Sequence, residues 1–233
     1  MKKLIVMILA LCLALSFSLA VAETKISVSG SGETRISADT AVISLGVNAR
    51  DKNVLKAQQK VNEAIAAIRK ALIEQGVPEE NITTDYININ PIYDYSFDLA
   101  RLTAYSANTI LAIKVTDMDK VGALIDAAFE AGANDLNGIT FSASDTREAK
   151  AEALKLAVED AKQKAEILAA AAGLRITGIE IISEGGVYSY SNTVGNVYTR
   201  DMKAEAAYGD AATVVQAAKL IVSANVTVTY TAE

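Results

Sequence analysis

The sequence predicts an α+β fold of mainly antiparallel sheets with three helices, built as two lobes of the β-α-β-β type. Several short runs alternate apolar and polar residues, which indicates strands. Three longer stretches carry apolar residues at three- and four-residue steps, which indicates amphipathic helices. The order of these elements occurs twice, so the two lobes would span 23–132 and 133–233.

The first 22 residues predict a signal peptide that is cleaved. Two lysines precede an apolar run, which ends in the small-x-small cleavage site Ala20-Val21-Ala22. The alternative is an uncleaved membrane anchor, although the run is near the lower length limit for a span. No second apolar run is long enough to span a membrane. We therefore expect an exported protein, in the periplasm or at the cell exterior, with no integral membrane span after cleavage.

Composition excludes several function classes. The net charge is −6 and becomes −8 after cleavage, because two lysines and no acid are lost. An acidic chain makes nucleic acid an improbable partner, since phosphate binding needs a basic patch. The chain has no histidine, and its one cysteine, Cys12, leaves with the signal peptide. Zinc sites built on His or Cys, thiol chemistry and Ser-His-Asp triads are thereby excluded, and we expect no cofactor.

The first lobe begins with two strands between residues 24 and 50, and Gly30 and Gly32 predict a turn or bulge between them. A helix follows, with Asp51 as its cap and Gly76 as its stop. Its apolar face contains Val54, Ala57, Val61, Ala64, Ile65, Ile68 and Leu72. The stretches 82–95 and 102–115 then predict a β-hairpin with a polar, aromatic tip at about 95–101. A second helix over 117–132 closes the lobe, with Val121, Leu124, Ile125 and Ala128 facing inward.

The second lobe begins with a strand over 135–144. Asp145 and Glu148 then resemble a capping box for a third helix. The apolar stripe of this helix is rich in alanine and contains Leu154, Ala157, Val158, Ala161, Ala165, Leu168 and Ala172. Alanine permits close packing against a sheet or another helix, so the stripe fits either a core contact or a contact between subunits. A strand over 176–183, a long excursion over 184–212 and a final strand over 217–232 complete the chain.

No catalytic motif stands out, so we do not expect an enzyme. Gly30-Ser31-Gly32 begins like a dinucleotide loop, but Arg35 occupies the place of the third glycine. Asp117-Met118-Asp119 begins like a calcium loop, but Ala128 replaces the final glutamate. Carboxylate pairs such as Glu79 with Glu80 or Asp94 with Asp98 are typical of solvated loops. A cofactor-free hydrolase built on carboxylates stays open as an alternative.

Aromatic residues gather around the first hairpin. Strand-face packing would explain them, and so would a contact surface, because tyrosine combines a large area with a polar tip. The residues that we expect at an interface with another subunit or partner are Tyr93, Tyr95, Phe97 and Tyr105.

Three stretches, 76–95, 119–142 and 152–179, resemble in their order the SIMPL-domain family, which includes YggE-like periplasmic proteins and outer-membrane immunogenic antigens. The resemblance implies an exported α+β protein. Some members form large ring- or channel-like homo-oligomers, some are linked to oxidative-stress defence, and none has established catalytic residues. Many members have a Pro-Gly turn before the last strand, where this chain has "VVQAAK", so the path of 209–219 is not implied.

These observations favour an exported, non-enzymatic cell-envelope protein that self-assembles into a homo-oligomer. Any role in oxidative-stress defence would be indirect, since the mature chain has neither cysteine nor histidine. The alternative is a monomeric module that binds a ligand or a cell-wall component with the 184–212 excursion.

Overall fold

A computed structural model of the chain describes residues 23–96, 100–190, 192–195, 213, 215 and 219–233. The predicted signal peptide, part of the hairpin tip and most of the segment before the last strand lie outside this part. The described residues form three α-helices and two antiparallel sheets, which confirms the α+β prediction. Within the described residues, no helix has the length and apolar character needed to cross a membrane.

The chain packs as two compact units that are interleaved in sequence. The larger unit contains Glu33–Ala153 and Val187–Ser223. The smaller unit contains the described residues up to Gly32 together with Leu154–Gly186 and Ala224–Glu233. This division differs from two consecutive lobes at 23–132 and 133–233, because strands from both ends of the chain share one sheet.

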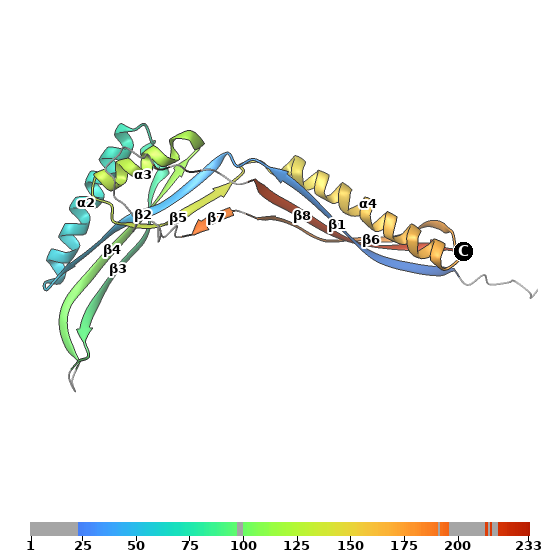
Figure 1. The fold of residues 1–233 in the computed structure, drawn as a ribbon, viewed down its shortest axis with the longest axis horizontal. Helices are drawn as coiled ribbons and strands as arrows, with labels where there is room; N and C mark the ends of the chain where they lie inside the picture. Colours follow the sequence, from blue (N-terminus) through green and yellow to red (C-terminus); the bar gives the residue numbers. More distant parts are fainter. Residues whose placement is uncertain (1–22, 97–99, 191, 196–212, 214, 216–218) are drawn as a thin grey trace, which may run out of the picture. The chain divides into compact units, whose positions relative to one another are not determined.

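The larger unit contains a five-stranded sheet with the order β3-β4-β2-β5-β7 (Figure 1). Its strands are β2 (Thr40–Asp51), β3 (Ile82–Asp94), β4 (Arg101–Val115), β5 (Asp135–Ser142) and β7 (Asn192–Gly195). The predicted hairpin is confirmed, since β3 and β4 pair from Ile82↔Ile113 to Asp94↔Arg101. The central strand β2 pairs antiparallel with both β4 and β5.

Two helices, α2 (Val54–Glu74) and α3 (Val121–Glu130), cover one face of this sheet (Figure 1). Their apolar residues recur at helical spacing, so each helix presents one stripe to the sheet. Residues of α2, α3 and the facing sides of β2 and β4 form one core, which includes Ile43, Leu45, Ile68, Leu72, Leu111, Ile113, Leu124 and Ile125. The predicted inward faces of both helices are therefore confirmed.

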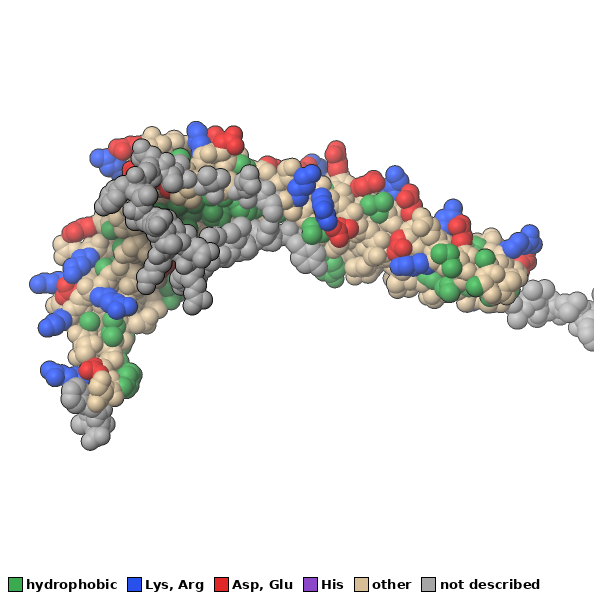
Figure 2. All heavy atoms as spheres, in the orientation of Figure 1, with side chains coloured by type: hydrophobic (Ala, Val, Ile, Leu, Met, Phe, Trp, Pro, Cys, Tyr) green, Lys and Arg blue, Asp and Glu red, His purple; other side chains and the backbone are tan. Residues whose placement is uncertain are grey.

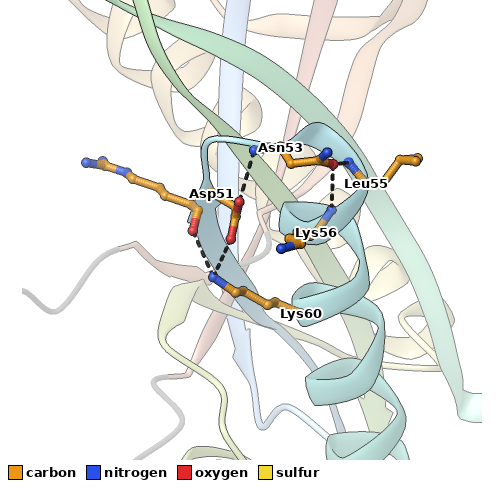
Figure 3. Close-up of polar contacts among 6 residues, drawn as sticks. Asp51, Asn53, Leu55, Lys56 and Lys60 are labelled. Atoms are coloured by element: carbon orange, nitrogen blue, oxygen red, sulfur yellow. Dashed lines mark hydrogen bonds and ion pairs between the residues drawn. The ribbon is translucent and has the colours of Figure 1, made fainter.

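The start of α2 differs from the prediction in its cap. The Asn53 side chain, not Asp51, accepts hydrogen bonds from the Leu55 and Lys56 N–H groups, at 2.9 and 3.3 Å (Figure 3). Asp51 instead accepts from the Asn53 N–H at 2.9 Å and from the Lys60 ammonium at 2.9 Å. Asparagine is among the best capping residues, because its short side chain reaches the free N–H groups of the first turn. Asp51 thus holds the capping residue and the second helical turn in place.

The smaller unit contains most of a three-stranded sheet with the order β1-β8-β6, whose strands each end in the larger unit at one end. Its strands are β1 (Thr24–Ile36), β6 (Ile176–Tyr190) and β8 (Leu220–Ala232). The prediction of a turn or bulge at Gly30 and Gly32 is wrong, because β1 runs through both glycines without interruption. The two glycines that suggested a turn are both buried strand positions, and they mark a close contact on one face of the sheet.

The helix α4 (Arg147–Ala171) runs along the three-stranded sheet (Figure 1). Its buried residues recur every four positions and form what we call the alanine row: Ala149, Ala153, Ala157, Ala161, Ala165 and Ala169. The predicted stripe is therefore partly wrong. Ala157, Ala161 and Ala165 face inward as expected, whereas Leu168 and Ala172 are exposed. The predicted pairs of Asp160 with Lys164, at 2.7 Å, and of Lys162 with Glu166, at 3.8 Å, are confirmed.

Gly30 explains why the row consists of alanine. A Cβ atom at Gly30 would lie 2.0 Å from the Ala157 carbonyl oxygen and 2.7 Å from the Ala161 Cβ. The backbone of α4 therefore approaches β1 so closely that no side chain fits between them. Asp160 reinforces this contact by accepting a hydrogen bond from the Ser31 N–H at 2.8 Å, and Lys164 donates to the Ser29 carbonyl at 3.0 Å.

The predicted excursion over 184–212 contains more strand structure than the sequence indicated. Residues 184–190 belong to β6 and 192–195 form β7, whereas 196–212 lie outside the described residues. Thr213 is held against α3, because its N–H donates to Asp126 at 3.0 Å. A Cβ atom at Gly122 of α3 would lie 1.9 Å from the Thr213 carbonyl oxygen, so this glycine makes room for the returning chain.

Candidate interaction surfaces

The β3–β4 hairpin extends beyond the rest of the larger unit. The central strand β2 pairs with β4 only as far as Asp51↔Tyr105. Past Tyr105, β3 and β4 pair with each other alone, through Tyr93↔Leu102 and Asp94↔Arg101. The register shifts between Ile92 and Tyr93, which is typical of a bulge that bends a strand and redirects its side chains. Among the described residues, the end of the hairpin therefore lies beyond the other strands of its sheet.

Three large apolar side chains are exposed at this end, and we call them the hairpin cluster: Tyr93 at 43%, Tyr95 at 74% and Leu102 at 43%. The rings of Tyr93 and Tyr95 lie 6.3 Å apart at 49°, a common aromatic pair geometry. Leu102 is the strand partner of Tyr93. Figure 2 shows hydrophobic side chains on the surface beside the hairpin tip. Clustered exposed tyrosine and leucine are typical of a contact surface.

The other two predicted interface residues do not join this cluster. Tyr105 is half-buried and packs against the core of the larger unit, so it anchors the base of the hairpin. Phe97 lies outside the described residues. Asp94 orders the turn instead, by accepting a hydrogen bond from the Ser96 N–H at 2.9 Å. The Ser96 hydroxyl and N–H together lower the pKa of Asp94 and keep it ionised.

A second exposed apolar region lies on β6, an edge strand of the smaller unit, and the sequence analysis did not single it out. Ile179, Ile181 and Ile182 are 54%, 56% and 55% exposed. Adjacent isoleucines at 181 and 182 break the alternation expected of a strand with one buried face. This break in the sequence pattern indicates that both faces of β6 lie outside the core.

Two of the acidic residues considered for chemistry, Asp117 and Glu79, have structural partners, whereas Asp98 lies outside the described residues. Asp117 accepts from the Asp119 N–H at 3.3 Å and caps a short 3₁₀ helix, Met118–Lys120, so it does not begin a calcium loop. Glu79 pairs with Arg69 at 3.5 Å. Among the described residues, no group of three or more His, Cys, Asp or Glu side chains is placed to hold a metal ion.

The larger unit also contains a hollow of about 150 Å³. Small-molecule sites usually measure about 300–1,000 Å³, so this one has room for only a small apolar group. Its lining comes from β1, β5, β6, β8 and the start of α4, with Ile36, Ser142, Ala143, Thr146, Ser189, Leu220 and Val222.

Comparisons with known proteins give relatives but no activity. The sequence model of a family described as SIMPL, protein of unknown function (DUF541), matches residues 26–230. The 26 kDa periplasmic immunogenic protein of Brucella melitensis is 32% identical over 158 residues, which are 66% of this chain and 63% of that protein. The uncharacterized protein YggE of Escherichia coli K12 is 25% identical over 169 residues, 72% of this chain and 67% of that protein. The matched region thus spans less than two thirds of the Brucella relative.

Proposed function

The chain belongs to the SIMPL family, and from that premise we propose that it is an exported, non-enzymatic cell-envelope protein that assembles into a ring- or channel-like homo-oligomer. The periplasmic name of the Brucella relative and the signal-peptide pattern before Glu23 support export. The absence of histidine from the whole sequence, together with the loss of its one cysteine on cleavage, supports a role without redox or triad chemistry.

The hairpin cluster carries the proposal of self-assembly. Two exposed tyrosines and an exposed leucine at the end of an unsupported hairpin leave apolar area in contact with water. Burying that area in an interface would contribute about 25 cal/mol per Å². Tyrosine has a rigid ring that loses little conformational entropy on contact, and it is enriched at interfaces. A hairpin that reaches beyond its own core can contact another copy without disturbing the fold that supports it.

Light scattering after size exclusion, in the absence of detergent, tests the assembly. We expect the mature protein, 23–233, to have a mass many times that of the protomer. The triple variant Tyr93→Ser, Tyr95→Ser, Leu102→Ser should reduce that mass, with unchanged circular dichroism. Leu55→Ser is a matched control, because Leu55 is also exposed in the same unit but lies on α2. A wild-type protein that stays monomeric at high concentration would overturn the proposal.

The second candidate is a monomeric module that binds a ligand with the 184–212 segment. The observation in its favour is that Ser189 of this segment lines the 150 Å³ hollow. Filling the hollow with Ala143→Leu should abolish binding of small apolar probes if this alternative holds. The oligomer proposal instead predicts that Ala143→Leu leaves the assembled mass unchanged.

A role in oxidative-stress defence would be indirect. Thiol peroxidase chemistry requires a cysteine, and the mature chain has none. The purified mature protein should therefore not consume hydrogen peroxide faster than its methionines are oxidised. Catalytic turnover of peroxide, measured with a peroxide electrode, would contradict the non-enzymatic assignment.

A further inference from the structure

The three-stranded sheet of the smaller unit has two open edges. Its order is β1-β8-β6, so β1 and β6 each pair on one side only within the described part of the chain. These edges are long, at 13 residues for β1 and 15 for β6, and neither contains proline. A long edge presents a row of N–H and C=O groups that can take a further strand, and proteins normally shorten, charge or cover such edges.

The two edges differ in chemistry. From 176 to 190, β6 has no lysine or arginine, and it carries Glu180 and Glu184 beside its three exposed isoleucines. Antiparallel self-pairing of this segment would bring those glutamates together, which is unfavourable. The β1 edge instead offers Lys25 and a row of serines, and its Glu33 is already paired with Arg35 at 3.5 Å. The β6 edge is thus acidic and the β1 edge is basic at Lys25, which already forms an ion pair with Glu180 within the chain.

The register places the two edges level with each other. The Thr229 hydroxyl donates to the Ser27 hydroxyl at 3.3 Å, which aligns β8 with β1. The hydroxyls of Thr177 and Thr231 lie 2.9 Å apart, and a Cβ atom at Gly178 would also lie 3.2 Å from the Thr231 hydroxyl, so β6 bulges opposite Thr231. Past this bulge Glu180 lies beside Thr229, on the face where it reaches Lys25. Since β8 runs antiparallel to both neighbours, β1 and β6 run in the same direction. Ser27 and Glu180 are therefore level but about 9.6 Å apart, two strand spacings across the sheet.

We propose that the β6 edge of one copy receives the β1 edge of a second copy as a parallel strand, so that the three-stranded sheet continues from subunit to subunit. This inference rests on the proposed self-assembly and names one of its contacts. This contact covers the exposed isoleucines of β6. It also gives hydrogen-bond partners to the N–H and C=O groups of both open edges. Because the contact joins two different edges, it is head-to-tail and closes into a ring if the rotation per subunit allows.

Cysteine pairs test the contact in the full chain with Cys12→Ser, which removes its one native thiol. Ser27→Cys and Glu180→Cys cannot bridge within a chain, because disulfides require Cα atoms within about 7 Å. Oxidation should therefore give a ladder of dimers, trimers and larger species on non-reducing gels. The matched control pairs Ser27→Cys with Glu184→Cys, which is displaced by about 13 Å along the strand and should give no ladder.

Ile181→Lys gives an independent test, because a charge on the edge blocks strand addition. We expect its mass by light scattering to fall, whereas Ile167→Lys, on the exposed face of α4, should keep the wild-type mass. An assembled wild type with no Ser27/Glu180 ladder and an unaffected Ile181→Lys variant would overturn the strand contact and leave the proposed function standing. Dimers from Glu180→Cys alone, without a ladder, would overturn it in favour of self-paired β6 edges. A monomeric wild type would overturn both proposals.

Discussion

The two units solve the same packing problem, a helix on a sheet, with opposite kinds of residue. In the larger unit, α2 and α3 fill the space above the sheet with isoleucine, leucine and valine. In the smaller unit, α4 meets the sheet with the alanine row and lies directly over Gly30. The first contact depends on the volume of its side chains and the second on the closeness of its backbones. The two units should therefore respond oppositely to changes in residue size.

The difference in buried area is large for each residue. Burying a leucine or isoleucine side chain stabilises a fold by about 1.5–3 kcal/mol, whereas one methyl group contributes about 0.8 kcal/mol. Hydrogen bonds from α4 to the backbone of β1, which involve Asp160 and Lys164, compensate in part for the small side chains of the alanine row. The smaller unit therefore depends more on polar contacts and, under our proposals, on neighbouring copies.

The largest expected effect is truncation in the larger unit. Leu72→Ala removes a fully buried side chain and should lower the free energy of unfolding by about 2–5 kcal/mol, measured by urea denaturation. Leu168→Ala is the control, because this leucine of α4 is 51% exposed and its truncation should change stability by about 0.5 kcal/mol or less. Equal losses for the two variants would mean that Leu168 faces a core.

Enlargement should instead damage the smaller unit. Ala161→Leu adds three carbons where the Ala161 Cβ already contacts the space above Gly30, and should cost about 1–3 kcal/mol. Ala170→Leu, on the exposed side of the same helix, should be nearly neutral because leucine and alanine have similar helix propensities. Hydrogen exchange read by peptide mass should assign the loss to α4, β1 and β8. A neutral Ala161→Leu variant would show that the helix and the sheet can separate.

The smallest expected effect is the dependence of stability on pH and salt, which should differ between the two units. The Ser144 hydroxyl and N–H lower the pKa of Asp39 in the larger unit. The Lys164 ammonium, followed by the Ser31 N–H, lowers the pKa of Asp160 in the smaller unit. Because both folded pKa values lie below the unfolded value of about 3.9, each carboxylate stabilises the fold above that pH. This contribution is lost as the pH falls through the folded pKa.

Asp39→Asn and Asp160→Asn should each reduce the acid sensitivity of their own unit, measured by hydrogen exchange between pH 5 and pH 2. High salt should weaken the Asp160 contribution more, since its main partner is an ion and ionic screening acts on exposed pairs. Identical salt responses at the two sites would contradict the assignment of an ion pair at one and neutral donors at the other.

Most elements could be predicted from the sequence because periodicity reports which face of an element is buried. The hairpin, α2, α3 and β8 appear at the positions that their patterns indicated. The errors occur where packing depends on the size of a residue and not on its hydrophobicity. Gly30 was interpreted as a turn, and Leu168 was placed on the buried face of α4. Both follow from one closely packed contact that no sequence pattern of hydrophobicity records.

The candidate surfaces were less accessible to prediction. Tyrosine content identified Tyr93 and Tyr95, but sequence could not separate them from Tyr105, which supports the hairpin from its half-buried position. The β6 edge was missed because its exposure depends on sheet order. Strands β1 and β6 are edges because β8 lies between them and pairs with both. These pairings join distant parts of the chain.

The pairing of β1 with β8 also bears on the order of folding during export. Ser27 and Thr229, which meet across these strands, are 202 residues apart in sequence. If the amino-terminal end emerges first from the translocation channel, β1 has no partner until β8 follows, whereas β2 to β5 can already pair. Contacts of such long sequence separation form slowly. During this interval β1 stays unpaired, and its open backbone favours pairing with the wrong chain.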